Sequence, residues 1–508
     1  MTADSHAEDR SWMQRFLALI ERAGNRLPHP FLLFLILCAV VAVLSWLMAM
    51  GGASGINPKT GKEIAVQSLI SGDGLVFALT SIAKNYVNFP PLGVILVIML
   101  AIGVADKVGM IASLMQVSVI KAPRVLTTFV IFLVGMCSHM ASDAAYIVLI
   151  PLSAMIFQAV GRNPLVGAVT GYVAVGAGYD ASLFITPVDI ILSGITTGAA
   201  HAIDPKAYVS PLDNYYFIAC SAVLLSLVGT LVIERIVEPL AGKYTGDVVL
   251  KLEPIGQVES RALKRVGWVA LAFLVVVLAA VLPAGSPLRN EQGGLVPSPF
   301  LDAIVAILAV FFLTLGWVYG SAVGKVKSAR DVAGYMAEAV KELAPTLVLF
   351  FAISQFLAWF RWTNLGEWIA IHGSHLLDTG GLGGTPLVLA FVLLAMVMSV
   401  FITSGSAQWS LMAPVFVPMM MLVGLEPALV QAAFRISDSV TNVISPMSPY
   451  FAVCLAFLQR YQKDAGIGTL AAMTLPISIG FLVAWTAFLV LWIELGLPLA
   501  PGVGLFLP

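Results

Sequence analysis

Runs of about twenty apolar residues recur along the whole chain and constrain its fold more than any other feature. A helix that spans a membrane needs about 20 consecutive apolar residues. Only 11% of the 508 residues are charged, whereas soluble domains carry roughly 25%. So few charges could not cover the surface of a soluble protein. The sequence therefore predicts an all-α polytopic membrane protein and excludes a soluble multidomain enzyme.

About nine of these runs are interpreted as membrane spans. They lie near residues 31–50, 92–105, 165–200, 215–233, 266–282, 300–319, 343–360, 428–457 and 472–493. Two further apolar regions, near 125–160 and 386–425, are interrupted at their middle by small polar residues. The basic clusters of the loops all lie in the cytoplasm if these two regions enter the membrane and return. We therefore expect about nine transmembrane helices plus two re-entrant helical hairpins, with a cytoplasmic N-terminus.

The chain repeats itself at an offset near 263 residues. After each interrupted region a proline, a glycine and a second proline follow at one spacing: Pro151, Gly161 and Pro164, then Pro414, Gly424 and Pro427. The first repeat starts inside and the second outside, so the two are inverted, which is the architecture of secondary transporters. The expected divisions are a cytoplasmic tail (1–26), a first inverted repeat (27–240), a cytoplasmic loop and connector span (241–295) and a second inverted repeat (296–508).

Composition also limits the partners and the energy source. The net charge is −1 and no basic block could follow a phosphate backbone, so nucleic acid is excluded as a partner. No G-x-x-x-x-G-K-[ST] loop occurs, which excludes ATP as the energy source. No group of His and Cys residues has metal-ligand spacing, so we expect no cofactor and no firm metal site. A coupling ion, H⁺ or Na⁺, remains as the driving force.

Both interrupted regions carry polar residues where such residues are costly. The first contains Ser138-His139-Met140-Ala141-Ser142-Asp143, and the second contains Thr403-Ser404-Gly405-Ser406-Ala407-Gln408-Trp409-Ser410. Small residues at a hairpin tip free backbone carbonyls for Na⁺ and N–H groups for an anion. The alternative is close helix packing by small residues. His139, beside Asp143, could relay protons or be a satisfied buried histidine.

Each hairpin is followed by a span that glycine and proline break at its centre, at 176–189 and at 435–449. Arg435 and Asp438 share one helical face and could pair as a structural clamp. As part of a site, Arg435 could hold a carboxylate bidentately, Trp409 could stack an aromatic ring, and Asp438 could take a proton or an ion. Asp189 and Asp180 are the matching candidates in the first half, although either could simply cap a half-helix.

Several of these stretches resemble the p-aminobenzoyl-glutamate transporter (AbgT) family, and the resemblance covers nearly the whole chain. The matching stretches are Leu27–Phe34, Ser138–His139, Ser142–Ala144, Asp189–Ile195, Ser404–Ser410, Phe434–Ser439 and Phe457–Tyr461. The resemblance implies a homodimer in which each subunit has nine transmembrane helices and two re-entrant hairpins. Family members that read Gly-Phe-Thr-Ala-Asn at Gly178–Ser182 lack an acid at the position of Asp180.

The resemblance also ties seven residues of this chain to transport: Asp189, Ser406, Trp409, Pro427, Arg435, Asp438 and Pro446. Taken together with the polar residues of the hairpins and broken spans, they give the expected site. The expected substrate-binding residues are Trp409, Arg435, Ser406, Pro427 and Pro446. The expected coupling-ion residues are Asp189, Asp438, Asn442, Ser142 and Asp143, with a possible Na⁺ near Asp438.

The leading hypothesis is a bacterial inner-membrane secondary transporter of p-aminobenzoate-type aromatic acids. These comprise p-aminobenzoyl-glutamate, p-aminobenzoic acid and sulfonamide antimetabolites, with efflux by the proton motive force as the expected mode. The alternative is an Na⁺- or H⁺-coupled importer of p-aminobenzoyl-glutamate. An intramembrane hydrolase is a distant alternative, because Ser142-Asp143 beside His139 has no third partner. An ion channel would show flux without accumulation against a gradient.

Overall fold

The computed structural model describes residues 28–56, 61–141, 144–246, 248, 256–283, 285–295, 298–379 and 383–507. The tail predicted for residues 1–26 and the hairpin-tip residues Ser142 and Asp143 lie outside the described residues, so their predicted roles stay predictions.

Within the described part of the chain, seven helices are long and apolar enough to cross a membrane. They are α2 (Pro30–Met50), α5 (Pro90–Lys107), α11 (Tyr215–Val232, continued by a π-helical turn into α12, Glu238–Ala241), α13 (Gln257–Val281), α15 (Ile304–Ala322), α16 (Ala329–Trp362) and α22 (Ile467–Glu494). Two further predicted spans are each broken into two shorter helices: α9 (Pro164–Gly176) with α10 (Pro187–Ala200), and α20 (Pro427–Thr441) with α21 (Pro449–Tyr461). The prediction of a helical, polytopic membrane protein is confirmed.

Two helical hairpins precede the broken spans. The first consists of α7 (Thr127–Cys137) and α8 (Ala144–Ala159), and the second of α18 (Gly384–Ser399) and α19 (Gly405–Leu422). Pro164 opens α9 and Pro427 opens α20, where the missing N–H of proline leaves no helical hydrogen bond unmade. Since these two prolines match at the 263-residue offset, the structure supports the predicted repeat, whose boundaries stay a prediction.

Glycines let the first hairpin lie directly against the first broken span. A β carbon at Gly171 of α9 would lie 2.6 Å from the carbonyl oxygen of Leu149 and 2.8 Å from Oγ of Ser153. One turn earlier, a β carbon at Gly167 would lie 2.6 Å from the carbonyl oxygen of Ser153. This Gly-x-x-x-Gly spacing allows the backbones of α8 and α9 to touch. The hairpin is thereby fixed relative to the polar break between α9 and α10.

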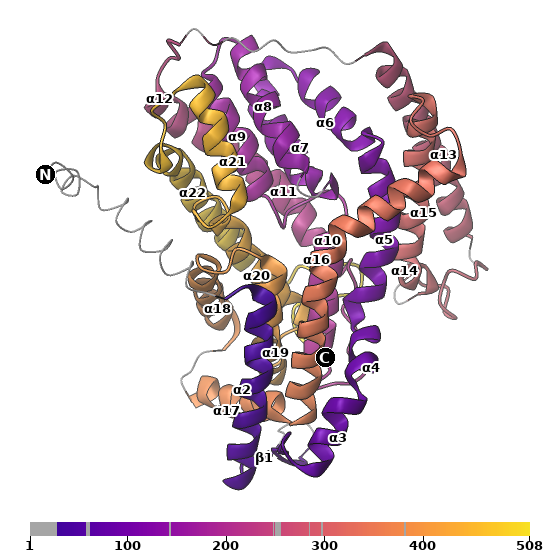
Figure 1. Cartoon of the computed structure of the whole chain (residues 1–508), viewed down its shortest axis with the longest axis vertical. Coiled ribbons are helices and arrows are strands. Elements are labelled where there is room, and N and C mark those ends of the chain that lie inside the picture. The colour runs from indigo at the N-terminus through magenta and orange to yellow at the C-terminus, as the bar shows by residue number, and fades with distance from the viewer. Residues whose placement is uncertain are drawn as a thin grey trace, which may run out of the picture.

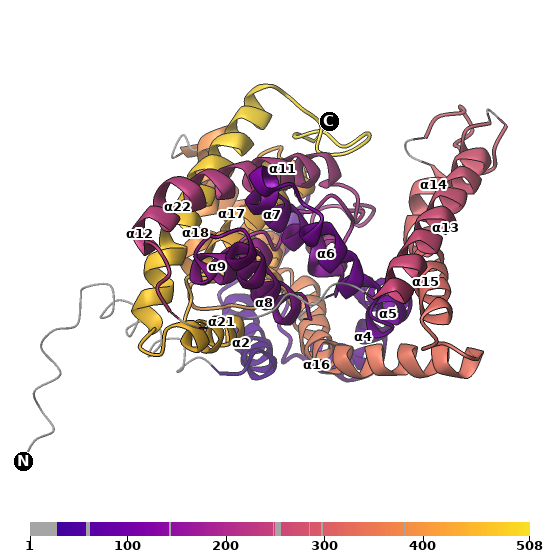
Figure 2. The ribbon, with the colours of Figure 1, turned by 90° about the horizontal axis from the view of Figure 1, so that it is seen from above.

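The second half of the sequence runs partly outside the central bundle. Helices α13, α14 (Pro299–Asp302) and α15 lie at one side of the molecule, where α15 packs on α5, and α16 leads from them back across the bundle (Figure 2). In the bundle, α16 packs against α2 and α5. The side group formed by α13 and α15 therefore exposes apolar residues such as Leu271, Leu274 and Val276.

Several short elements were not predicted from the sequence. They are the helix α6 (Met110–Ile120), the antiparallel strands β1 (Ser54–Ile56) and β2 (Glu63–Ala65), and the helices α3 (Gly72–Thr80), α4 (Ile82–Val87) and α17 (Leu365–Thr379). All except α6 gather at the end of the molecule where α2 ends (Figure 1). Their apolar runs are too short to be recognised by a span-length criterion.

Candidate substrate and coupling site

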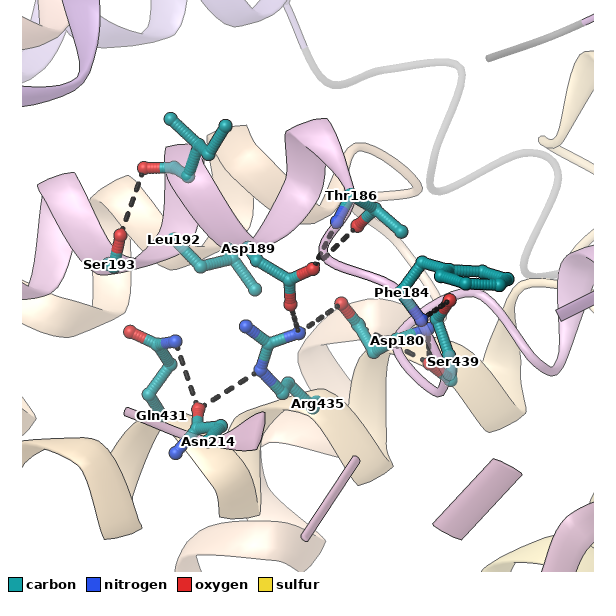
Figure 3. A network of polar contacts seen from close by, with 12 residues as sticks. Asp180, Phe184, Thr186, Asp189, Leu192, Ser193, Asn214, Gln431, Arg435 and Ser439 are labelled. Atoms are coloured by element: carbon teal, nitrogen blue, oxygen red, sulfur yellow. Dashed lines mark hydrogen bonds and ion pairs between the residues drawn. The ribbon is translucent and has the colours of Figure 1, made fainter. Parts of the chain in front are cut away.

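Arg435 lies at the centre of a buried polar network that joins the two halves of the chain (Figure 3). Its Nη1 lies 2.8 Å from Oδ1 of Asp189 in the first turn of α10, and 3.4 Å from Oδ1 of Asp180 in the break between α9 and α10. The guanidinium belongs to α20, so each broken span contributes one side of these ion pairs. All three side chains are almost completely buried. Removing a partner would leave a buried charge uncompensated.

Asp189 both caps a helix and pairs with the guanidinium. Its Oδ2 accepts hydrogen bonds from the backbone N–H of Thr186, at 2.6 Å, and from the hydroxyl of Thr186, at 2.8 Å. This is a capping box at the start of α10, where the helix dipole also favours a negative charge. Oδ1 remains free to pair with Arg435. Asp189 therefore caps the half-helix, as one interpretation of the sequence had it, and its predicted role in cation coupling stays a prediction.

Asp180 connects the first break to the second broken span and does not cap a half-helix. Its Oδ2 accepts a hydrogen bond from the hydroxyl of Ser439 on α20 at 3.2 Å. Its backbone N–H lies 3.0 Å from the same hydroxyl oxygen. The side chain that departs from the family pattern is thus bound to both Arg435 and Ser439. In this chain the position of Asp180 is part of the network.

Two amide side chains complete the coordination of the guanidinium. Nε of Arg435 donates a hydrogen bond to Oδ1 of Asn214 at 3.2 Å. The side-chain oxygen of Gln431 accepts a hydrogen bond from Nη2 of Arg435 at 3.0 Å. Asn214 is held in place by donating from Nδ2 to the carbonyl oxygen of Ala428 at 2.7 Å. Sequence reasoning missed both amides. Gln431 could have been found because it lies four residues before Arg435 on the same helical face, whereas Asn214 gave no signal.

Trp409 lies in the same network through its indole nitrogen. Nε1 donates to Oγ1 of Thr196 at 2.9 Å. That hydroxyl donates to the carbonyl oxygen of Leu192 at 2.8 Å and accepts from the amide nitrogen of Gln431 at 2.6 Å. The indole is fully buried, and its ring lies 4.6 Å from the ring of Phe434, centroid to centroid. The hairpin tryptophan thus contacts α10 and α20 together. Thr196 is a further residue that sequence reasoning missed.

Asp438 does not pair with Arg435 as their spacing suggested, because Arg435 is paired with Asp189 and Asp180. The carboxyl group of Asp438 instead lies against Gly405 at the start of α19, where a β carbon would come within 3.0 Å of its Cγ. The N-terminus of a helix favours a negative charge. Oδ1 of Asp438 is buried and has no hydrogen-bond partner among the described residues. Among the described residues, it is the one oxygen of the network that could still accept a proton or bind a cation.

The other predicted residues lie around this network. Pro427 opens α20, Asn442 is its C-cap residue, Pro446 lies in the break before α21, and Ser406 is the second residue of α19. Oγ of Ser406 lies 3.5 Å from Oγ of Ser404, which caps α19. Their roles in binding stay predictions.

His139 lies apart from the ion pairs. Its Nε2 is 2.6 Å from the carbonyl oxygen of Val175, and its ring meets the edge of Tyr179 at 4.6 Å. The imidazole is buried and its ring nitrogen is hydrogen-bonded, as in the second of the two interpretations made from the sequence.

Two broken helices that present a buried guanidinium and buried carboxylates to each other, with hairpin residues packed on them, are typical of membrane transporters. The sequence model of the AbgT putative transporter family matches residues 15–507. The chain belongs to this family, and the resemblance read from its motifs is confirmed. Its homologues carry the names of transporters or efflux pumps, which agrees with the prediction that the protein is not an enzyme.

Relatives with known names or structures cover nearly the full length. The p-aminobenzoyl-glutamate transport protein of Escherichia coli is 39% identical over 485 residues, 95% of this chain and 96% of that protein. The MtrF structure from Neisseria gonorrhoeae, described as one of a class of antimetabolite efflux pumps, has 40% identity and a TM-score of 0.91, over 96% of this chain and 100% of that one. The Alcanivorax borkumensis YdaH transporter, described as having an unusual topology, has 37% identity and a TM-score of 0.89, over 93% of this chain and 100% of that one.

Proposed function

We propose that the protein transports p-aminobenzoate-type aromatic acids across the bacterial inner membrane, driven by a cation gradient. The substrate class comprises p-aminobenzoyl-glutamate, p-aminobenzoic acid and sulfonamide antimetabolites, and the mode is efflux by the proton motive force. The names of the Escherichia coli and Neisseria gonorrhoeae relatives support this substrate class. The same cation-coupled site could instead drive uptake. Uptake is the competing proposal, and the experiment below distinguishes it from efflux.

The observation that carries the proposal is the charge balance of the buried network. Among the described residues, the buried acids are Asp180, Asp189 and Asp438, and the buried cation is Arg435. Three ionised carboxylates beside one guanidinium would leave two uncompensated negative charges in a region from which water is excluded. Buried charges are stable only when they are paired. A proton or Na⁺ at the open oxygen of Asp438 would reduce this excess, which couples cation binding to the site.

The substrate roles follow from the chemistry of the same side chains. A substrate carboxylate would replace one aspartate on Arg435, because guanidinium binds carboxylates bidentately. The substrate ring would lie on Trp409, which requires Phe434 to leave the indole face it now covers. Exchange of an aspartate for a substrate anion would link substrate binding to the protonation of the freed carboxyl. A potential of 100 mV supplies about 2.3 kcal/mol per charge, enough for roughly 50-fold accumulation.

Purified protein in liposomes tests the proposal, with radiolabelled p-aminobenzoyl-glutamate and sulfamethazine measured in parallel. A pH gradient and a Na⁺ gradient are imposed separately, each in both directions. Accumulation under one gradient identifies the coupling ion, and its sign relative to the gradient identifies efflux or uptake. Mass analysis of the recovered substrate separates transport from hydrolysis. If neither compound moves under either gradient, the proposed function is wrong.

Variants of Asp438 separate coupling from substrate binding. Asp438→Asn removes the charge that would hold the cation, so gradient-driven accumulation should be lost while exchange of labelled for unlabelled substrate persists. Asp464→Asn, an exposed acid after α21, is the matched control and should behave as the wild type. Normal accumulation by Asp438→Asn would remove Asp438 from coupling.

We further propose a homodimer with the N-terminus in the cytoplasm. The exposed apolar residues of α13 and α15 support a partner copy, because they extend well beyond the central bundle (Figure 2). Mass measurement of the detergent complex tests the dimer, and a Val275→Cys variant of α13 tests whether this surface is shielded from lipid-soluble thiol reagents. A monomeric mass would contradict the dimer.

A further inference from the structure

A polar pocket lies on the opposite side of α10 from the Arg435 network. It has a volume of about 440 Å³ and is lined by residues of α3, α4, α5, α10 and α16. Three lining residues carry basic groups: Lys84, His201 and Arg361. None of its described lining residues is acidic. The pocket is within the size range of small-molecule sites, roughly 300–1,000 Å³.

The pocket forms because α10 leaves its neighbours near its C-terminal end. At Gly194 the helix is pressed against α5, since a β carbon there would lie 2.7 Å from Cβ of Pro91. One turn later, a β carbon at Gly198 would meet only Cδ1 of Leu357, at 3.9 Å. Thr196, between the two glycines in the sequence, takes part in the Trp409 network. One helix, about 10–12 Å in diameter, therefore separates the pocket from the central site.

The two permanent cations of the pocket have no carboxylate partner. Among the described residues, no ion pair or hydrogen bond joins Lys84 or Arg361 to an acid, and both side chains are exposed. His201 adds little charge. Its pKa is lowered mainly by burial and to a smaller extent by the nearby Arg361 guanidinium. Its Nε2 lies 2.9 Å from the carbonyl oxygen of Ala207. The pocket thus presents two unneutralised positive charges.

Aromatic and amide groups complete the lining. Phe77 stacks on Trp362, with centroids 5.2 Å apart and planes 12° from parallel, and the lining residue Phe89 is buried. Nδ2 of Asn85 donates to Oε1 of Gln355 at 3.0 Å, which fixes the position of this lining amide. Cations next to aromatic rings suit an anion that also has an apolar ring.

Membrane topology makes these cations unusual. With a cytoplasmic N-terminus, α2 ends on the outer face, where α4 and the C-terminal end of α16 also lie (Figure 1). Basic residues are concentrated on the cytoplasmic side of membrane proteins. Lys84 and Arg361 could serve only to offset the negative C-terminal ends of α4 and α16. Offsetting the helix ends, however, does not require that both cations line the same pocket or that aromatic residues line it with them.

We propose that this pocket, named the outer vestibule, binds small aromatic carboxylates as a second site distinct from the Arg435 network. The choice of this chemical class rests on the proposed function, whereas the requirement for an anion rests on Lys84 and Arg361. A carboxylate held there stands one helix away from the central guanidinium. The vestibule therefore collects substrate on the outer face or receives it after export.

Equilibrium binding to the purified protein in detergent is the first test, with p-aminobenzoyl-glutamate and benzoate as probes. The Arg435→Gln background removes the central guanidinium, so that remaining binding reports on the vestibule. In this background, Lys84→Gln with Arg361→Gln should weaken binding about 10-fold or more, since two charge-assisted contacts are lost. Lys206→Gln, an exposed lysine outside the pocket, is the control and should leave the affinity unchanged.

A steric test leaves every charge in place. Gly198→Leu would place a side chain into the open space beside Leu357, and vestibule binding should be lost. Gly198→Ala adds one carbon at an ordinary contact distance and should retain most of it. Melting temperature and size-exclusion profiles verify that the variants are folded.

The outcomes distinguish the vestibule from the transport function. Vestibule binding by a protein that transports neither labelled compound supports the vestibule and contradicts the proposed function. Unchanged affinity in the Lys84 and Arg361 variant overturns the vestibule, whether or not transport is normal. A loss of thermal stability with unchanged affinity assigns both cations to the helix ends and also overturns it. Absence of any binding in the Arg435→Gln background also overturns the vestibule.

Discussion

At the scale of single residues, the buried guanidinium of Arg435 is shared among more partners than its neighbours along the helix could provide. Two carboxylates and the side-chain oxygen of Asn214 reach it from the first half of the chain. An arginine with several buried acceptors is fixed in position and remains charged. Because these partners share one guanidinium, the effects of replacing them are expected to depend on one another.

Asp189 allows the cap and the ion pair to be measured apart. Asp189→Asn keeps an oxygen that can accept from Thr186 but loses the negative charge, whereas Asp189→Ala loses both. We expect Asp189→Ala to unfold at lower temperature than Asp189→Asn, by the equivalent of about 1 kcal/mol for a lost helix cap. Both should lose gradient-driven transport. Equal stability of the two variants in thermal unfolding would contradict the capping role.

Trp409 combines a hydrogen bond with a large buried ring. Trp409→Phe keeps most of the packing against Phe434 and loses the hydrogen bond to Thr196, which should cost about 1 kcal/mol. Trp409→Ala should cost about 3–5 kcal/mol, because it also leaves a cavity. Denaturation of the detergent-solubilised variants measures both. In transport assays, a higher KM for Trp409→Phe protein that is still folded would assign the indole to substrate binding.

At the scale of elements, close contacts between backbones fix the hairpins against the broken spans. Gly171 is a tight example, with α8 in direct contact. Gly171→Leu should push α8 away from α9 and destabilise the fold by about 1–3 kcal/mol, the usual cost of overpacking. Gly334→Leu on α16 is the matched control, because a β carbon there meets nothing within 4 Å. A stable, active Gly171→Leu protein would show that the hairpin does not depend on this contact.

At the scale of the whole molecule, Asp213 in the loop before α11 makes stability depend on pH. Burial raises the pKa of Asp213, before α11, to about 7, although the backbone N–H of Ser210 donates to it at 2.9 Å. The folded protein then binds this proton more tightly than the unfolded chain does. The stabilisation that Asp213 contributes is therefore greatest at low pH and is lost as the pH rises from about 4 to about 7.

Asp213→Asn should remove this dependence. At pH 8 the variant should be more stable than the wild type by up to about 4 kcal/mol, at 1.36 kcal/mol per pKa unit. At pH 4 the two should unfold together. Melting curves between pH 4 and pH 8 measure the difference. A constant offset between the two proteins at every pH would contradict the raised pKa.

Sequence alone determined the class of fold, because spanning a membrane requires long apolar helices and places a cost on every polar residue within them. That cost is why Arg435, Asp438, Asp189 and Trp409 stand out within their apolar surroundings in the sequence. The breaks within two of the spans could also be predicted from the sequence, because proline and glycine interrupt helices. The short elements at the end of α2 could not be predicted in this way, because their apolar runs are shorter than a membrane span.

Only the tertiary structure decided which polar groups meet. Spacing along α20 suggested that Arg435 pairs with Asp438, yet partners from the distant break between α9 and α10 bind it instead. Asn214, Thr196 and the outer vestibule had no signal in the sequence, because each depends on residues brought together from helices far apart along the chain. Hydropathy indicates whether a segment is buried in the membrane or exposed to water. It carries no information about which other segment packs against it.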